Sequence, residues 1–450
     1  MDGRVYCHRG ILPGLTRQLH LNLFLQDAGH HDAAWRLPES DPDAVVSLAH
    51  YQRLARIAEA ARFDSVFLAD ALALIGEVRR RSGASRIEPL TLLAALAAST
   101  EHIGLIATAS TTYGHPYDVA RRFAGLDHVS GGRAGWNIVT SAGDGLARNF
   151  GAEQQAAHED RYRDADEFVD VVTRLWDSWE DDARVVDKEA GVFIDDTRVH
   201  AIGHRGRRFS VEGPLDVARP PQGHPVRVQA GSSDRGREFA ARHAEAVFTA
   251  QLTLDGAQEF YADLKERVAA HGRDPDGVKI LPGLVPIVAP TEAEALDEHE
   301  RLESYASTTS GLSMLSFVFG IDLSGLELDA PLPRRVVEHR AEGHQSRSAL
   351  LVDFAQEHDL TVRELIGRTS GGRGHRVLIG DPVQVADSLQ TWFDEGAADG
   401  FNLMPPTLPG SLLAFTELVV PELQRRGIFR TEYRGTTLRD HLGLARPARG

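Results

Sequence analysis

The run Gln229-Ala230-Gly231-Ser232-Ser233-Asp234 combines residue types that suit an anion. It follows an apolar run and precedes a helical pattern, so Ser232 and Ser233 stand at the start of a helix. Unpaired backbone N–H groups and hydroxyls at such a start favour a phosphate, and Gly231 lets the backbone approach a ligand closely. The alternative is that Ser233 or Asp234 only caps the helix. The run alone leaves both interpretations open.

A second candidate is the pair His158 and Tyr162. Residues four apart lie on one face of a helix, so an imidazole and a phenol can point at one ligand. Such pairs are common in helices, and an exposed His above a core Tyr would show the same spacing.

Other familiar catalytic patterns are missing from the sequence. His30-His31-Asp32 could suggest a metal, but neighbouring residues do not face one way, and no third ligand follows at a standard spacing. We therefore expect no metal site. The chain also lacks the phosphate-loop, nucleophile-elbow, His-Glu-x-x-His and Rossmann glycine signatures.

The elements that must position these residues alternate between strand and helix. Eight β-rich runs are each followed by a helical pattern, and several are continuously apolar, as strands buried on both faces should be. The runs are Leu19–Gln26, Ser65–Asp70, Ile103–Thr111, Gly135–Ser141, Val226–Gly231, Ala246–Gln251, Lys279–Val288 and Phe401–Pro405. Eight such units predict an α/β fold, a closed (β/α)₈ TIM barrel with long insertions. The rival is a doubly wound open sheet with a second domain.

The barrel interpretation implies one domain over residues 1–450. Insertions at about 142–225 and 306–380 supply the extra length, and a C-terminal arm covers about 427–450. We expect the second insertion, with its Ser307–Gly311 and Gly371–Gly374 runs, to be a mobile lid; a static surface excursion is the alternative. The arginines of the arm could contact a neighbouring subunit, or the arm could be a disordered terminus.

Chemistry in such barrels lies at the C-terminal ends of the strands. The polar residues at these ends are Asp70, Thr108–Thr112, Asn137–Ser141, Ser232 with Ser233, and Gln251. They predict a pocket of hydroxyls and amides with no Arg or Lys cluster.

Composition narrows the function classes further. The 450 residues carry 49 Lys plus Arg and 65 Asp plus Glu, a net charge of −16, which disfavours a nucleic-acid partner. Cys7 is the single cysteine, so no disulfide forms within the chain. No apolar run approaches the roughly 18 residues of a membrane span. We expect a cytoplasmic protein without a membrane partner.

Several blocks of the sequence resemble a known family. Gly135-Trp136-Asn137-Ile138-Val139-Thr140-Ser141 is similar to a motif of the bacterial-luciferase-like flavin monooxygenases. The branch it resembles contains nitrilotriacetate monooxygenase component A, dibenzothiophene sulfone monooxygenase and pristinamycin IIA synthase. Further blocks occur in the same order, at Gly29–Arg36, Phe67–Asp70, Gln229–Ser233, Phe239–Glu245 and Asp399–Asn402.

The resemblance implies a luciferase-like barrel that binds FMN. It places the flavin contacts on Asp70, Thr108, His158, Tyr162 and Ser232, with Ser233, Asn137 and Ser141 as neighbours. His158, Tyr162 and Ser232 would hold the phosphate end, and Asp70, Thr108 and Asn137 would lie nearer the ring system. It leaves the catalytic residues unassigned.

The resemblance also implies a two-component flavin-dependent monooxygenase. A separate NAD(P)H:flavin reductase would supply reduced FMN, and O₂ would react with it to a flavin (hydro)peroxide that oxygenates a small-molecule substrate. Relatives of this kind associate, so a homo-oligomer, a dimer or tetramer, is expected.

Two other functions fit the same barrel, a deazaflavin-dependent dehydrogenase and a non-catalytic flavin-binding protein. The substrate is open. An aminopolycarboxylate would need several arginines in the pocket, and the candidate run His204–Arg208 is better explained as a solvated hairpin.

Overall fold

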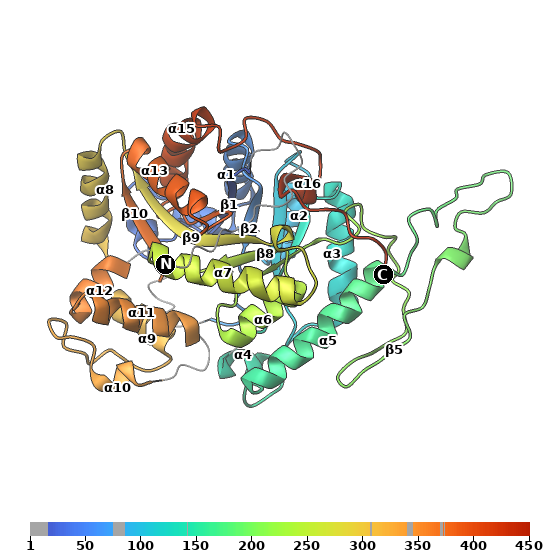
Figure 1. Ribbon diagram of the computed structural model, residues 1–450, viewed down its shortest axis with the longest axis horizontal. Helices are drawn as coiled ribbons and strands as arrows, with labels where there is room; N and C mark the ends of the chain where they lie inside the picture. The colour runs from blue at the N-terminus through green and yellow to red at the C-terminus, as the bar shows by residue number, and fades with distance from the viewer. Residues whose placement is uncertain are drawn as a thin grey trace, which may run out of the picture.

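Eight parallel strands close into a barrel in the computed structural model, as the sequence predicts (Figure 1). The structure describes residues 17–74, 86–141, 143–306, 308–339, 345–369, 372 and 374–450. The barrel strands are β1 (His20–Phe24), β2 (Ser65–Leu68), β3 (Gly104–Ser110), β4 (Ala134–Val139), β7 (Val226–Gln229), β8 (Ala246–Thr249), β9 (Lys279–Val288) and β11 (Gly400–Leu403). Each falls within a predicted run or overlaps most of it.

Closure of the barrel follows from the strand pairing. The order β11-β1-β2-β3-β4-β7-β8 is joined at its two ends by β9, which pairs with both β8 and β11. Every pair in this ring is parallel. The open doubly wound sheet is therefore excluded.

Helices cover the outside of the ring (Figure 1). They are α1 (Leu48–Ala60), α2 (Pro89–Ala97), α3 (Pro116–Ser130), α4 (Asp144–Asn149), α5 (His158–Trp176), α6 (Asp234–His243), α7 (Leu254–Ala270), α8 (Glu292–Tyr305), α13 (Pro382–Asp394), and α14 (Gly410–Ala414) continuing through a π-turn into α15 (Val420–Arg425). The apolar spacing over Ala44–Arg62 predicts a single helix, but the structure divides this segment in two. A short 3₁₀ helix, Pro42–Val46, ends at Ser47, which is extended before α1 begins.

The Gly135–Ser141 block shows how strand alternation builds the barrel. Trp136 is fully buried and points outward, where its ring meets Phe123 of α3 and Phe168 of α5 at 5.8 and 6.0 Å between centroids. Asn137, the next residue, therefore points into the barrel. A side chain at Gly135 would come within 2.8 Å of Ile106 Cγ1, so the interior has room only for glycine there.

The first insertion has two parts. α4 and α5 complete the barrel layer, and the chain then makes a long excursion that projects from the body near the β5 label (Figure 1). Within it, β5 (His204–Arg205) and β6 (Ser210–Val211) form an antiparallel pair, which confirms the predicted hairpin. Its arginines pair outside the barrel, Arg205 with Glu212 and Arg207 with Asp164.

The second insertion forms a small helical layer with its own core. Its helices are α9 (Thr308–Phe319), α10 (Arg334–Val337), α11 (Gln345–Glu357) and α12 (Val362–Thr369). Leu315, Phe319, Leu351 and Leu365 are fully buried together. Ser307, Gly371 and Arg373 of the expected lid runs lie outside the described residues. The last residues of this segment form a strand that the sequence analysis missed, β10 (Arg376–Gly380), which pairs with the second half of β9.

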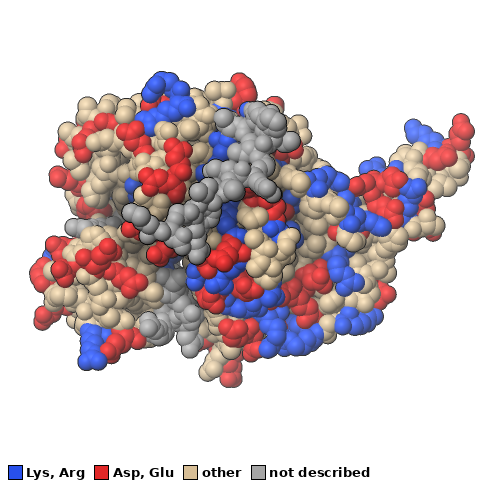
Figure 2. Space-filling model, viewed as in Figure 1, with Lys and Arg blue, Asp and Glu red and all other residues tan. Residues whose placement is uncertain are grey.

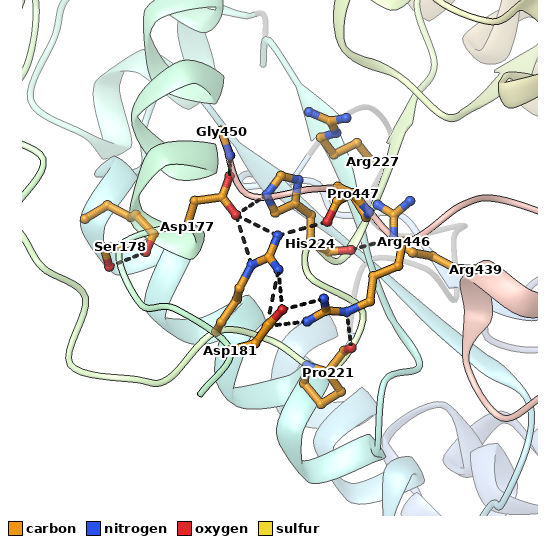
Figure 3. A network of polar contacts seen from close by, with 12 residues as sticks. Asp177, Ser178, Asp181, Pro221, His224, Arg227, Arg439, Arg446, Pro447 and Gly450 are labelled. Carbon is orange, nitrogen blue, oxygen red and sulfur yellow. Dashed lines mark hydrogen bonds and ion pairs between the residues drawn. The ribbon is translucent and has the colours of Figure 1, made fainter. Parts of the chain in front are cut away.

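The C-terminal segment packs back onto the base of the barrel through α16 (Leu438–His441). Leu438 is fully buried among barrel-interior residues such as Ile106 and Val226. Beyond it, Arg446 pairs with Asp181, and the Gly450 N–H lies 3.3 Å from Asp177 Oδ2 (Figure 3). Four arginines of the C-terminal segment therefore form ion pairs within the chain, namely Arg430, Arg439, Arg446 and Arg449.

The face drawn in Figure 2 carries Lys and Arg side chains interspersed with Asp and Glu over its described residues. No helix in the described ranges is long and apolar enough to cross a bilayer.

Candidate active site

A cavity of about 380 Å³ opens at the C-terminal ends of β4, β7 and β8. This is the end of the barrel where the strand-end residues were expected to meet. Five of the eight predicted site residues line it, namely Ser141, His158, Tyr162, Ser232 and Ser233.

The turn from β7 into α6 forms one wall. Ser233 is the N-cap of α6, and its Oγ accepts a hydrogen bond from the Gly236 N–H at 3.1 Å. The capping interpretation is therefore correct for Ser233, yet the residue also lines the cavity. Ser232 does not cap the helix, and its Oγ lies 3.0 Å from Thr249 Oγ1 on β8. The result is a hydroxyl-lined helix start that faces the cavity.

Gly231 makes this turn possible. A Cβ there would lie 2.9 Å from the Tyr162 hydroxyl and still closer to the Gln229 amide nitrogen. Gln229 Oε1 is buried and has no hydrogen-bond partner among the described residues. A polar group of a ligand would satisfy this oxygen, because a buried acceptor without a partner is costly.

The first turns of α5 form an adjacent wall. His158, Arg161 and Tyr162 follow the i, i+3, i+4 spacing and all line the cavity. The ring of His158 is 4.9 Å from that of Tyr162, so both parts of the predicted pair face one space. Burial, followed by the nearby Arg161 guanidinium, lowers the pKa of His158 below its usual range. Without a ligand this environment favours the neutral imidazole.

Contacts between α5 and α6 hold this wall in place. Asp166 of α5 accepts hydrogen bonds from Arg235 at 2.6 Å and from His243 at 2.9 Å, both on α6. Phe239 of α6 packs edge-on against Tyr162 at 5.6 Å. Tyr162 and the start of α6 consequently keep a fixed relation to one another.

Thr108 and Asn137 form a linked pair inside the barrel. Thr108 Oγ1 donates to the Leu68 carbonyl at 2.8 Å and accepts from Asn137 Nδ2 at 2.8 Å. Asn137 Oδ1 is buried and has no partner among the described residues. Thr108 thus orients the amide, and Asn137 presents the unpaired oxygen.

Asp70 does not line the described cavity. It follows β2 at the same end of the barrel and is partly buried, and this burial raises its pKa. His30 and His31 serve the fold, since His30 Nε2 lies 2.9 Å from the Phe24 carbonyl oxygen and His31 Nε2 lies 3.1 Å from Glu303 Oε1.

The structure adds cations that the sequence analysis did not place here. Arg161 Nη1 donates to the carbonyls of Thr140 and Ser141 at 3.1 Å each, and Arg347 of α11 also lines the cavity. The sequence predicts no Arg or Lys cluster at the strand ends, and these two arginines come instead from the helices α5 and α11. Arg161 could have been found from its helical spacing to His158, whereas nothing in the sequence near Arg347 indicates the cavity.

The site is thus a cavity at the mouth of the barrel with a hydroxyl-lined helix start. Comparisons with known proteins identify the family. A family model described as luciferase-like monooxygenase matches residues 23–399. The chain belongs to this family. It is a flavin-dependent monooxygenase of the two-component type, as the similarity to named monooxygenases shows.

Three relatives define the branch. The chain is 49% identical to nitrilotriacetate monooxygenase component A of Aminobacter aminovorans, covering 96% of this chain and 98% of the relative. It is 48% identical to N-acetyl-S-(2-succino)cysteine monooxygenase of Bacillus subtilis, with the same coverage. Dibenzothiophene-sulfone monooxygenase of Rhodococcus erythropolis is 44% identical, again with 96% and 98% covered. The predicted family branch is confirmed.

Solved structures share the fold of this chain. A riboflavin lyase structure with modified FMN and riboflavin matches with a TM-score of 0.85 at 34% identity, covering 95% of this chain and 96% of that one. Two F420-dependent enzymes match at 15% and 14% identity with a TM-score of 0.56, which shows a shared fold only. The dehydrogenase alternative therefore gains no support beyond the fold.

Proposed function

We propose that the protein uses reduced FMN and O₂ to insert one oxygen atom into a small organic substrate, with a separate NAD(P)H:flavin reductase as its partner. The sum of the reaction is reduced FMN plus O₂ plus substrate, giving oxidised FMN, water and oxygenated substrate. The observation that carries this proposal is the cradle at Gly231, where the helix start, the Tyr162 hydroxyl and an unpaired Gln229 oxygen surround a space that a side chain would fill.

The residues present fit the phosphate end of FMN. Ser232 supplies a hydroxyl, α6 supplies backbone N–H groups, and Tyr162 supplies a phenol that α5 and α6 hold in position. Helix starts and hydroxyls are the donors that phosphates prefer. His158, beside them, would become protonated when a phosphate dianion binds.

We assign the ring end of the flavin to the pair Thr108 and Asn137 inside the barrel. Asn137, oriented by Thr108, offers its buried Oδ1 to a donor such as a ring N–H. Asp70, Ser141 and Ser233 complete the proposed set of cofactor-binding residues. The bound flavin supplies the oxygen chemistry, and the protein's task is to position it and to keep water out.

The deciding experiment combines binding and turnover. Purified protein is titrated with FMN in both redox states and then supplied with a flavin reductase, NADH and ¹⁸O₂. The panel follows the relatives' names, with nitrilotriacetate, N-acetyl-S-(2-succino)cysteine and dibenzothiophene sulfone. We expect FMN to bind and one ¹⁸O atom to enter one of these compounds or a close analogue. If the protein bound neither redox state, or if deazaflavin bound more tightly than FMN, the proposal would be wrong.

A further inference from the structure

The cavity has a charge opposite to that of the chain. Two arginines and two histidines are among the described residues that line it, and no Asp or Glu is among them. The chain as a whole carries a net charge of −16. A cleft of one sign attracts ligands of the other, so this composition favours an anionic ligand.

The four basic side chains come from separate parts of the fold. Arg161 and His158 belong to α5, on the barrel side, beside the hydroxyls of the proposed phosphate site. Arg347 belongs to α11 of the second insertion, and His375 comes just before β10. One phosphate group accounts for the pair on α5, whereas Arg347 and His375 need another explanation.

Arg347 is held in place by its surroundings. Its Nη2 donates to His375 Nε2 at 3.1 Å. The His375 ring is stacked on Phe248 of β8, with 4.9 Å between centroids and 9° between planes. A side chain at Gly283 would collide with His375, so the glycine leaves the room that the ring occupies. This arrangement fixes an arginine at the cavity wall.

We propose that Arg347, positioned by His375, binds an acidic group of the organic substrate. The inference rests on the proposed function and extends it, because it makes the substrate a carboxylate and assigns its recognition to the insertion. A guanidinium pairs with carboxylates and phosphates through two parallel hydrogen bonds. Since the phosphate site is already built at α6, the carboxylate is the expected partner.

The test uses simple probes. Succinate, citrate and the neutral diamide succinamide are titrated by calorimetry into protein saturated with oxidised FMN. We expect the wild-type protein to bind at least one of the two acids and not the diamide. Arg347→Met should lower the affinity for the acid about tenfold or more, and Arg347→Lys less, because lysine keeps the charge but not the paired donors.

Arg334→Met is the matched control. Arg334 lies in α10 of the same insertion, is exposed and pairs with Glu338, outside the cavity. This variant should bind the acids as the wild-type protein does. FMN affinity, measured on each sample, shows whether Arg347→Met retains its fold.

A second arm separates the two sources of an anion. FMN and riboflavin are titrated into the wild-type protein and into Arg347→Met. Unchanged affinity for both supports the substrate assignment. A loss of affinity for FMN alone would assign Arg347 to the phosphate and overturn the proposal.

The proposal is also overturned if neither acid binds the wild-type protein, or if Arg347→Met binds the acids equally well. Wild-type protein that bound no FMN would contradict the proposed function instead. In that case the acid titrations of the FMN-free protein would still decide the role of Arg347.

Discussion

At the scale of single residues, the site depends on the absence of a side chain at Gly231. A Cβ there would meet the Tyr162 hydroxyl at 2.9 Å and the Gln229 amide. Both are side-chain ends that can move, so Gly231→Ala should fold but displace the groups proposed to hold FMN. We expect FMN affinity to fall about tenfold or more, since losing one charge-assisted hydrogen bond has about that effect. Fluorescence titration with FMN measures it.

Gly125→Ala is the control for that variant. Gly125 lies within α3, and a Cβ there meets nothing within 4 Å. The change should leave FMN binding intact and stabilise the protein by about 0.5–1 kcal/mol, because alanine favours a helix. If both variants bound FMN like the wild type, the cradle would not hold the cofactor.

His158 provides a prediction on pH. Burial and Arg161 lower its pKa, Arg235 adds to this effect, and Glu159 opposes it. A phosphate dianion would favour the charged ring, so FMN binding should take up a proton. The affinity for FMN should therefore rise as the pH falls from 8 to 6.5, by at most about tenfold per pH unit. Riboflavin, without the phosphate, should show no such rise, and His158→Gln should remove it; a slope that persists in this variant would exclude His158.

Site residues were predictable from the sequence where residues with suitable side chains lie close together along the chain. Ser232 and Ser233 follow a strand and open a helix, and His158 and Tyr162 share a helical face, so short-range pattern was sufficient. Arg347 and His375 reach the cavity from an insertion whose position depends on long-range packing. No periodicity near them carries that information.

At the scale of elements, the eight barrel strands were predictable because they are buried, short and apolar. β10 was missed for a physical reason. It does not belong to the ring, and its residues, Arg376–Gly380, add to the second half of β9 beyond the barrel wall. Its apolar run, Val377–Ile379, is only three residues long, and the burial of its central residues is partial.

The second insertion leads to a prediction on dynamics. Its α11 contributes Arg347 and Leu350 to the cavity while its own core packs separately. Ligand contact should reduce opening of such a layer, so FMN should slow hydrogen exchange in α11. Mass spectrometry with and without FMN measures this, with α13, which lines no part of the cavity, as the internal reference. Equal exchange in α11 in both states would favour a static excursion over a lid.

At the scale of the whole molecule, the C-terminal segment closes the end of the barrel opposite the cavity. Leu438 fills the interior, and Arg439 donates to both Glu245 oxygens at 2.9 Å. Glu245 is buried between β7 and β8, and it also accepts from the Arg227 N–H at 3.1 Å. Burial alone would raise the pKa of Glu245, but Arg227 and Arg439 lower it well below its usual range. The last residues of the chain therefore stabilise the barrel that carries the site.

Arg439→Met should consequently destabilise the protein although the residue is far from the cavity. The change leaves a buried carboxylate with a weaker set of partners, which costs about 3–5 kcal/mol in unfolding free energy. Denaturant unfolding at pH 7 measures the loss. Adding Glu245→Gln should recover most of it, since glutamine still accepts from Arg227 without a charge. Arg425→Met, which removes an exposed arginine from Glu422 but leaves Arg426 paired with that carboxylate, should change nothing measurable.

The same pair predicts how the loss depends on pH. The folded pKa of Glu245 is depressed, so the stabilisation is present above its unfolded value, near 4, and declines as the pH falls toward the folded value. The difference between the wild type and Arg439→Met should therefore shrink when unfolding is measured at pH 5, 4 and 3. A difference that stayed constant over this range would mean that Arg439 stabilises the barrel by packing and by its bonds to the carbonyls of His224 and Ala445, not through Glu245.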